Sequence, residues 1–364
     1  MPSRQSILRL TQFPPDPNGH GACRRTLQLQ EMCEEAGFDV VDISLSPAPV
    51  SRLARYLRSS RWYGLGKRPI SHLHYGPGLV GAYDYALRQA FSQFEGARVV
   101  IWERTFDRLL PAIAREYSYR VIALPHNLET LCLPKSDAIQ GVAPEFNDEV
   151  ARLGEADACF TIAREEQWLL ANFGVPSTYL PYFPPTEVAV PLRRIRAARS
   201  LVPPSGQVLV LGNALHPPTA EGMTVAIREL KATLPKGSRI VVAGFGSEAL
   251  RELTNSPAIE IRGWSSPTAL EALLIETSVF MANQTRGAGA LTRIPEALLA
   301  GIPVLANAVA ARSAQDLPGV YVYQTTAELE SLLRNGLPTP PEPMRPASAT
   351  TRFQTVLCEF AAKP

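Results

Sequence analysis

The chain has 364 residues and a net charge of +2, and its composition is 46% hydrophobic and 19% charged. This length predicts two domains with ordinary cores, and the near-neutral charge argues against nucleic acid as a partner. The five cysteines form no CxxC pair, which argues against a disulfide framework and a zinc site. The sequence lacks both a run of about 18 apolar residues, as a membrane-spanning helix needs, and a recognisable signal peptide. We therefore expect a cytoplasmic protein.

Short apolar runs alternate with amphipathic segments along most of the chain. The runs predicted as strands are residues 7–11, 40–43, 99–102, 121–124 and 159–162, then 208–211, 240–243, 259–261, 279–281, 304–306 and 320–323. The segments predicted as helices include residues 22–35, 145–155, 164–172, 220–234 and 295–299. Apolar runs of about four residues between helical patterns are typical of strands buried on both faces of a parallel sheet. The pattern predicts a doubly wound α/β fold that occurs twice.

Proline-rich stretches divide the chain. Residues 181–204 are rich in proline and arginine, and we interpret them as a linker with at most one short helix. A second proline cluster at residues 337–346 precedes a helical pattern at 351–361. We expect an N-terminal Rossmann-like domain, a linker, a C-terminal Rossmann-like domain, and a tail with a helix, at residues 1–185, 186–205, 206–340 and 341–364.

The segment after the strand at 279–281 carries the strongest chemical signal. Gly287 and Gly289 leave backbone amides accessible next to a helix N-terminus, an arrangement that favours phosphate. Arg286 and Arg293 flank this loop and can add charge-assisted bonds to a diphosphate. Glu296, in the first helical turn, can accept hydrogen bonds from two ribose hydroxyls. By itself, a loop with two glycines is more often a plain βα turn with an acidic residue in the first helical turn.

The segment resembles the nucleotide-binding signature of glycosyltransferase family 4 (glycosyl transferases group 1), retaining enzymes with the GT-B fold. The matching residues are Gly287, Gly289, Glu296, Ala297, Ala300, Gly301, Pro303 and Val304. Weaker matches follow the family's order along the chain, at residues 19–21, 125–129, 156–163, 180–182, 208–218, 242–246 and 262–264.

This resemblance implies two facing Rossmann-like domains, with a C-terminal helix that crosses back to the N-terminal domain. It implies that the C-terminal domain binds a nucleotide-diphosphate sugar, that the N-terminal domain binds a glycan, lipid-linked or other hydroxyl acceptor, and that transfer retains configuration without a metal or cofactor. The implied donor-binding residues are Asn213, Gly244, Trp264, Gly287, Gly289, Ala290, Arg293 and Glu296. Gly19, His20 and Gly21 are implied on the acceptor or diphosphate side, and His126 as the catalytic residue.

The sequence departs from the family pattern at one informative position. Many members carry a second glutamate near Ala288, eight positions before Glu296. Three interpretations therefore stay open: an active hexosyltransferase in polysaccharide or glycoconjugate assembly, a degenerate protein that binds nucleotide or a partner without turnover, and a sugar-nucleotide epimerase. A dehydrogenase is disfavoured, because the first βα turn at residues 13–21 is too long and proline-rich for a tight dinucleotide-binding loop.

Two further features have alternative interpretations. His126 either contacts the donor or is a loop histidine satisfied by backbone, while Glu129 either orients it or caps the next helix. Residues 51–68, SRLARYLRSSRWYGLGKR, combine a basic face with aromatic side chains. They suit peripheral contact with an anionic membrane surface at the inner face or with a lipid-diphosphate acceptor. The alternative is a solvated helix face with Trp62 and Tyr63 packed inward.

Overall fold

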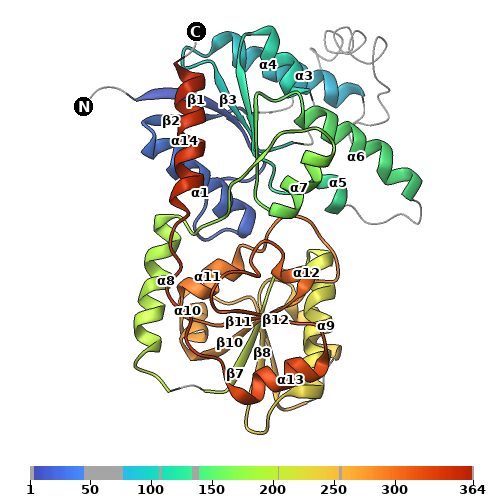
Figure 1. Cartoon of the computed structure of the whole chain (residues 1–364), viewed down its shortest axis with the longest axis vertical. Helices are drawn as coiled ribbons and strands as arrows, with labels where there is room; N and C mark the ends of the chain where they lie inside the picture. Colours follow the sequence, from blue (N-terminus) through green and yellow to red (C-terminus); the bar gives the residue numbers. More distant parts are fainter. Residues whose placement is uncertain are drawn as a thin grey trace. The chain divides into compact units, whose positions relative to one another are not determined.

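The computed structural model describes residues 4–44, 77–105, 109–132, 139–203, 205–253 and 256–362. The chain forms two compact units (Figure 1). Unit 1 comprises Met1–Pro14, Leu29–Pro181 and Ala347–Pro364, and unit 2 comprises Pro15–Gln28 and Tyr182–Pro346. The basic segment at residues 51–68 lies outside the described residues. Among those described, no helix is long and apolar enough to cross a membrane.

Unit 1 contains a six-stranded parallel sheet in the order β2-β1-β3-β4-β5-β6. Its strands are β1 (Gln5–Leu10), β2 (Phe38–Asp42), β3 (Val99–Trp102), β4 (Arg120–Ala123), β5 (Ala158–Thr161) and β6 (Thr178–Tyr179). Its helices are α3 (Pro77–Gln93), α4 (Leu110–Glu116), α5 (Glu129–Cys132), α6 (Ile139–Leu153), α7 (Arg164–Asn172) and α14 (Ala347–Ala361). A further helix, α1 (Gly21–Glu35), begins in unit 2 and ends in unit 1.

Both faces of this sheet are buried. Alternate residues of β3 belong to different cores, Val100 and Trp102 to one and Val99 and Ile101 to the other. Successive side chains of a strand point to opposite faces, so an uninterrupted apolar run indicates a strand covered on both sides. This physical rule explains why the apolar runs of the sequence located the strands correctly.

The C-terminal helix packs on unit 1. The ring of Phe353 meets that of Phe160 edge-on, with centroids 5.5 Å apart, and both side chains belong to one core. Gln354 Nε2 donates to the carbonyl oxygen of Met32 at 3.1 Å, which fixes α14 beside α1 (Figure 1). The expected return of the C-terminal helix to the N-terminal part of the fold is confirmed.

Unit 2 contains a second six-stranded parallel sheet, in the order β12-β11-β10-β7-β8-β9. Its strands are β7 (Gln207–Leu211), β8 (Arg239–Ala243), β9 (Ile259–Gly263), β10 (Thr277–Ala282), β11 (Val304–Asn307) and β12 (Val320–Tyr323). Its helices are α8 (Thr186–Arg199), α9 (Pro217–Thr233), α10 (Pro267–Glu276), α11 (Arg293–Leu299), α12 (Ala308–Ala311) and α13 (Thr326–Asn335), with a 3₁₀ helix at Ser247–Leu253. The first strand, β7, lies between β8 and β10, so the strand order reverses there. Ligands of open α/β sheets bind at such a switch point.

Residues 181–204 contain a longer helix than the short one that the sequence predicts. Most of this segment forms α8, a helix of 14 residues that contains Pro191. Val188, Leu192 and Ile195 are buried in a core of unit 2 at helical spacing, which places α8 against that unit. The helical period of this segment is hard to recognise in the sequence because Pro191 lies inside it, and proline normally interrupts a helix.

Candidate functional site

The predicted donor-binding residues gather at one edge of unit 2. Asn213 follows β7, Gly244 follows β8, Trp264 follows β9, and the loop with Gly287 follows β10. Because these strands are parallel, their carboxyl ends share an edge of the sheet. The structure therefore brings together predicted residues that are up to 83 positions apart in the sequence, from 213 to 296.

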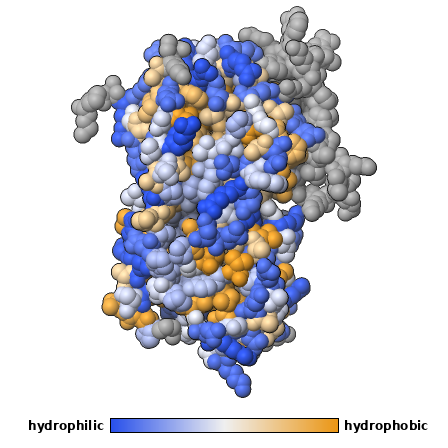
Figure 2. All heavy atoms as spheres, in the orientation of Figure 1, coloured by the Kyte–Doolittle hydropathy of each residue, from blue (hydrophilic) through white to orange (hydrophobic). Residues whose placement is uncertain are grey.

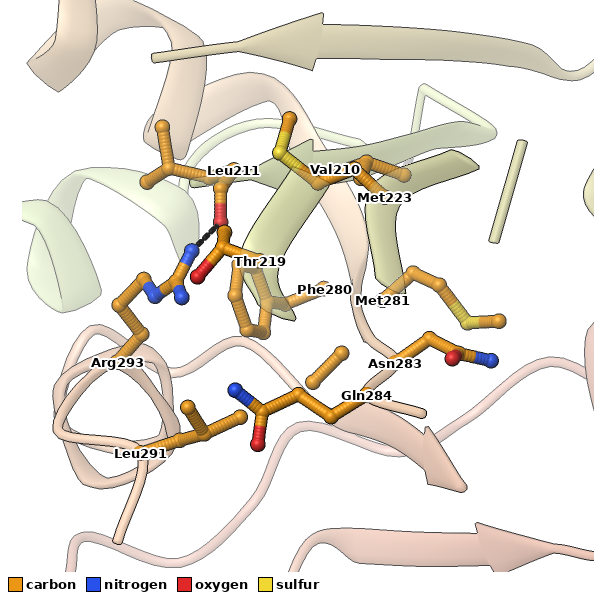
Figure 3. Close-up of a pocket in the computed structure, with 11 residues that line it drawn as sticks. Val210, Leu211, Thr219, Met223, Phe280, Met281, Asn283, Gln284, Leu291 and Arg293 are labelled. Carbon is orange, nitrogen blue, oxygen red and sulfur yellow. Dashed lines mark hydrogen bonds between the residues drawn. The ribbon is translucent and has the colours of Figure 1, made fainter. Parts of the chain in front are cut away.

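A small pocket lies at the switch point between β7 and β10 (Figure 3). Its cavity volume is about 20 Å³, which has room for about one water molecule. The lining residues are Val210, Leu211, Thr219, Met223, Phe280, Met281, Ala282, Asn283, Gln284, Leu291 and Arg293. Seven of these are apolar, and the polar lining residues are Thr219, Asn283, Gln284 and Arg293.

Arg293 borders this pocket. Its Nη1 donates to the carbonyl oxygen of Leu211, at the end of β7 (Figure 3). Burial lowers the pKa of the guanidinium, and the nearby Glu296 carboxylate opposes that effect. Gly212 makes room for the side chain, since a Cβ at that position would lie 2.6 Å from Arg293 Nη1. A positive charge is thus held at the switch point, as a diphosphate site requires.

The glycine-rich loop is held by Arg312. This guanidinium donates through Nη2 to Ala288 O at 2.7 Å, through Nε to Gly289 O at 2.7 Å, and through Nη1 to Gln284 Oε1 at 2.6 Å. Gly287 and Gly289 have φ values of +133° and +68°, in the region that favours glycine. A planar guanidinium that bonds successive carbonyls fixes one conformation of the loop. The sequence analysis missed Arg312, which belongs to no motif.

Asn307 fixes the start of the same loop. Its Oδ1 accepts from Gln284 N at 3.1 Å, and its Nδ2 donates to Gln284 O at 2.7 Å. The same Oδ1 also accepts from Ala310 N at 3.0 Å, which caps α12. The only signal for this role in the sequence is a polar residue at the end of a buried strand.

Gly244 allows the ends of β7 and β8 to approach each other. It has a φ of +113°, and a Cβ there would lie 2.0 Å from the carbonyl oxygen of Gly212. Its amide donates to Gly263 O at 2.8 Å, which ties this turn to β9 as well. Gly244 is therefore required by the backbone of the edge.

The remaining predicted side chains at this edge differ in exposure. Asn213 is exposed, and its Oδ1 accepts from Leu215 N at 3.0 Å within its own turn. Trp264 is 63% exposed, and Leu215 and Phe245 are likewise exposed at the ends of neighbouring strands. The exposed aromatic ring of Trp264 is therefore available for stacking.

Hydrophilic residues cover most of the surface visible in Figure 2, with small apolar patches between them.

Glu296 lies in the first turn of α11 and is buried. Its Oε2 accepts from Arg24 Nη1 at 2.6 Å, and its Oε1 accepts from the Tyr182 hydroxyl at 2.7 Å. The Glu296 charge raises the pKa of Arg24 despite burial, and burial followed by the same charge raises the pKa of Tyr182 well above its ordinary value. A carboxylate has about four acceptor positions, so two remain in addition to these bonds.

The N-terminal glycine segment lies against the start of α11, within unit 2. A Cβ on Gly21 would lie 2.4 Å from Thr292 Oγ1, so the backbone of this turn contacts the residue before the helix. Gly19 packs on Cys23, and exposed His20 accepts from Ala22 N at 3.3 Å through Nδ1. The structure thus brings the predicted diphosphate-side segment to the start of α11, the helix that follows the glycine-rich loop.

His126 lies in unit 1, just after β4. Its Nε2 is 2.9 Å from Glu103 Oε2, and both side chains are buried. The ring of Phe13 contacts the imidazole edge-on, with centroids 5.4 Å apart. The carboxylate that pairs with His126 is therefore that of Glu103, a residue that the sequence analysis did not single out. Glu129, which the sequence suggested either as a partner of His126 or as a helix cap, is the first residue of α5.

Buried carboxylates hold the loop that carries His126. Glu166 Oε1 accepts from Leu128 N at 2.9 Å, and Glu149 accepts from Glu129 N at 2.7 Å and from Thr130 N at 3.1 Å. Burial, followed by the charges of Glu149 and Glu166, raises the pKa of Glu129 to about 7. We therefore expect Glu129 to change its protonation state near neutral pH.

We expect Glu129→Gln to stabilise unit 1 at pH 8. Between the ordinary value of 4.5 and about 7, the folded Glu129 keeps a proton that the unfolded chain has lost. The unfolded state then binds fewer protons, so stability falls as pH rises through this window. The variant removes a penalty on the order of 3 kcal/mol at pH 8. Urea unfolding at pH 4.5 and pH 8 measures it, with the exposed Glu187→Gln as control. An equal pH dependence in wild type and Glu129→Gln would refute the assignment.

Within the described part of the chain, no group of His, Cys, Asp and Glu side chains is arranged to hold a metal ion. No protein-family model matches the sequence, and no curated protein matches it significantly.

Solved structures are similar to the chain over almost its full length. Sucrose-phosphate synthase from Thermosynechococcus elongatus has 13% identity, covers 99% of this chain and 100% of its own, and gives a TM-score of 0.65. HepE from Anabaena in complex with UDP-glucose has 14% identity, coverage of 99% and 98%, and a TM-score of 0.59. A UDP-forming α,α-trehalose-phosphate synthase from Burkholderia xenovorans has 11% identity, coverage of 99% for both chains, and a TM-score of 0.60. At these identities the likeness establishes the fold, and the expected GT-B fold is confirmed.

Proposed function

We propose that this protein is a glycosyltransferase that moves a sugar from a nucleotide-diphosphate sugar to a hydroxyl acceptor. The observation that carries the proposal is the carboxyl edge of unit 2, where Arg293 reaches the end of β7 at the switch point and the loop 287–290 and Glu296 follow β10. Structures with this fold include an Anabaena protein in complex with UDP-glucose, which supports a nucleotide sugar as the donor.

Each predicted residue has a role in this proposal. Backbone amides of Gly287, Gly289 and Ala290 bind the diphosphate together with Arg293, and Glu296 binds the ribose. Asn213, Gly244 and Trp264 complete the donor site, and Gly19, His20 and Gly21 form its diphosphate side. His126 is the catalytic residue, and unit 1 binds the acceptor.

Charge on the leaving diphosphate is stabilised by protein groups in this scheme. The bond between the anomeric carbon and the diphosphate oxygen breaks, the acceptor oxygen bonds to that carbon from the same face, and the acceptor's proton passes to the leaving diphosphate, so configuration is retained. Arg293 and loop amides, positioned before the reaction, oppose the charge that develops on the diphosphate. The reaction then needs no metal, and transfer takes place in the cytoplasm during polysaccharide or glycoconjugate assembly.

A second candidate is a protein that binds nucleotide without turnover. Two observations favour it: Ala288 replaces an expected carboxylate, and both oxygens of Glu296 already have protein partners. A thermal-shift screen with UDP, GDP, ADP and their sugar conjugates distinguishes the candidates. Stabilisation by one donor, followed by its hydrolysis or transfer, supports the enzyme. Stabilisation without release of the nucleotide supports the binding protein, and no stabilisation by any nucleotide contradicts both.

A further inference from the structure

The pair formed by Glu103 and His126 has the geometry of an oriented imidazole. The distance of 2.9 Å between Glu103 Oε2 and His126 Nε2 is that of a hydrogen bond, and the carboxylate side chain is fully buried. An ionised carboxylate only accepts hydrogen bonds, so the ring nitrogen that faces it must carry a proton. Protonation of Nε2 leaves Nδ1 as the acceptor of the neutral ring.

The position of Glu103 is fixed independently of His126. Its backbone amide donates to Leu10 O at 2.9 Å, directly after β3. The Thr11 hydroxyl donates to the same Oε2 at 3.4 Å, and Arg9 Nε lies 3.8 Å from Oε1.

Arg9 is itself held by two bonds to Asp42, at 2.6 and 3.0 Å. Burial lowers its pKa, but the Asp42 hydrogen bond and the Glu103 charge outweigh that effect, so the pKa is raised and the guanidinium stays charged. A fixed positive charge beside Glu103 favours its ionised, acceptor-only form.

We propose that Glu103 is a positioning residue that fixes the tautomer and the ring orientation of His126. The proposal rests on the proposed role of His126 as the catalytic residue. With Nε2–H directed at Glu103, Nδ1 is the nitrogen of the neutral His126 ring that can accept a hydrogen bond. Carboxylate partners that orient metal-bound histidines change metal affinity or activity by about 10- to 100-fold when removed, and we expect an effect of that order here.

Glu103→Gln is the sharpest test, because it keeps the volume and changes the hydrogen-bonding capacity. A glutamine amide both donates and accepts, so it tolerates either tautomer. In alkaline solution, where free imidazole is neutral, we expect the ¹⁵N spectrum of wild-type His126 to show the Nε2–H tautomer. The Glu103→Gln spectrum should show a mixture of tautomers. His126→Gln assigns the resonance.

Two further variants control for structural damage. Thr11→Val removes another donor to Glu103 Oε2 and should leave the tautomer unchanged. Glu103→Asp keeps an acceptor-only group and should retain the Nε2–H form. An Nδ1–H tautomer in the wild-type protein overturns the proposal, even where Glu103→Gln does not fold.

Kinetics give a second, separate measurement. With the donor found in the thermal-shift screen, we expect Glu103→Gln to lower kcat about 10- to 100-fold and to leave nucleotide affinity unchanged. A kcat equal to that of wild type, together with an unchanged tautomer, refutes the positioning role. The spectrum needs no substrate, so absence of any transfer activity contradicts the proposed function while the tautomer still decides the role of Glu103.

Discussion

Glu296→Ala is expected to weaken nucleotide binding by about 1–3 kcal/mol, because two hydrogen bonds from ribose hydroxyls to a carboxylate are lost. It should also lower the free energy of unfolding by about 2–3 kcal/mol. Without the carboxylate, the mostly buried Arg24 guanidinium and the buried Tyr182 hydroxyl lose their acceptor. Calorimetric titration with the nucleotide selected by thermal shift measures the first effect, and urea unfolding the second.

Two comparisons separate ribose binding from the structural effect. Tyr182→Phe removes one hydrogen bond to Glu296 and leaves the carboxylate paired with Arg24, so it should cost about 1 kcal/mol of stability. A 2′,3′-dideoxy nucleotide lacks the ribose hydroxyls, and its affinity should be the same for wild type and Glu296→Ala. Unchanged affinity of Glu296→Ala for the ribonucleotide would refute the ribose assignment and leave Glu296 a structural role.

Gly244→Ala should destabilise the protein by about 3–5 kcal/mol. The new Cβ would lie 2.0 Å from the carbonyl oxygen of Gly212, and neither backbone segment moves without disturbing the sheet edge. The φ of +113° adds strain for any residue with a side chain. Urea unfolding measures the loss. The same displacement should weaken nucleotide binding, since Gly212 also borders Arg293.

Gly237→Ala is the matched control for this change. Gly237 has a φ of +86°, and no atom lies within 4 Å of a Cβ built there. It should therefore show only the conformational penalty, about 1–2 kcal/mol. Equal losses for the two variants would mean that the close approach of Gly244 to Gly212 has no energetic consequence.

The strands could be predicted because their signal is local. Each predicted apolar run overlaps one of β1–β5 or β7–β12. For inner strands such as β3, burial on both faces requires apolar residues without alternation. The two-residue β6 is too short to show a period, and Pro191 concealed α8. In both cases tertiary contacts form an element that local propensity does not indicate.

The candidate site could be predicted only in part. Glycines after strands and an acidic residue in the first turn of a helix are local features, which is why Gly287, Gly289 and Glu296 stood out. The partners of the charged groups gave no comparable signal. Arg24 of α1 meets Glu296 of α11 across 272 positions, and Glu103 meets His126 across 23, because the fold packs distant helices together and aligns the ends of neighbouring strands.

The sequence by itself determined the doubly wound pattern, the glycine-rich loop at residues 287–290 and the location of His126 after a buried strand. These features follow from side-chain period and backbone conformation, which neighbouring residues set. Only the tertiary structure decided that Glu103 orients His126, that Arg312 holds the loop, and that Arg24 and Tyr182 bind Glu296. A buried charge takes whichever complementary group the packed fold places beside it, and that choice is not encoded in sequence spacing.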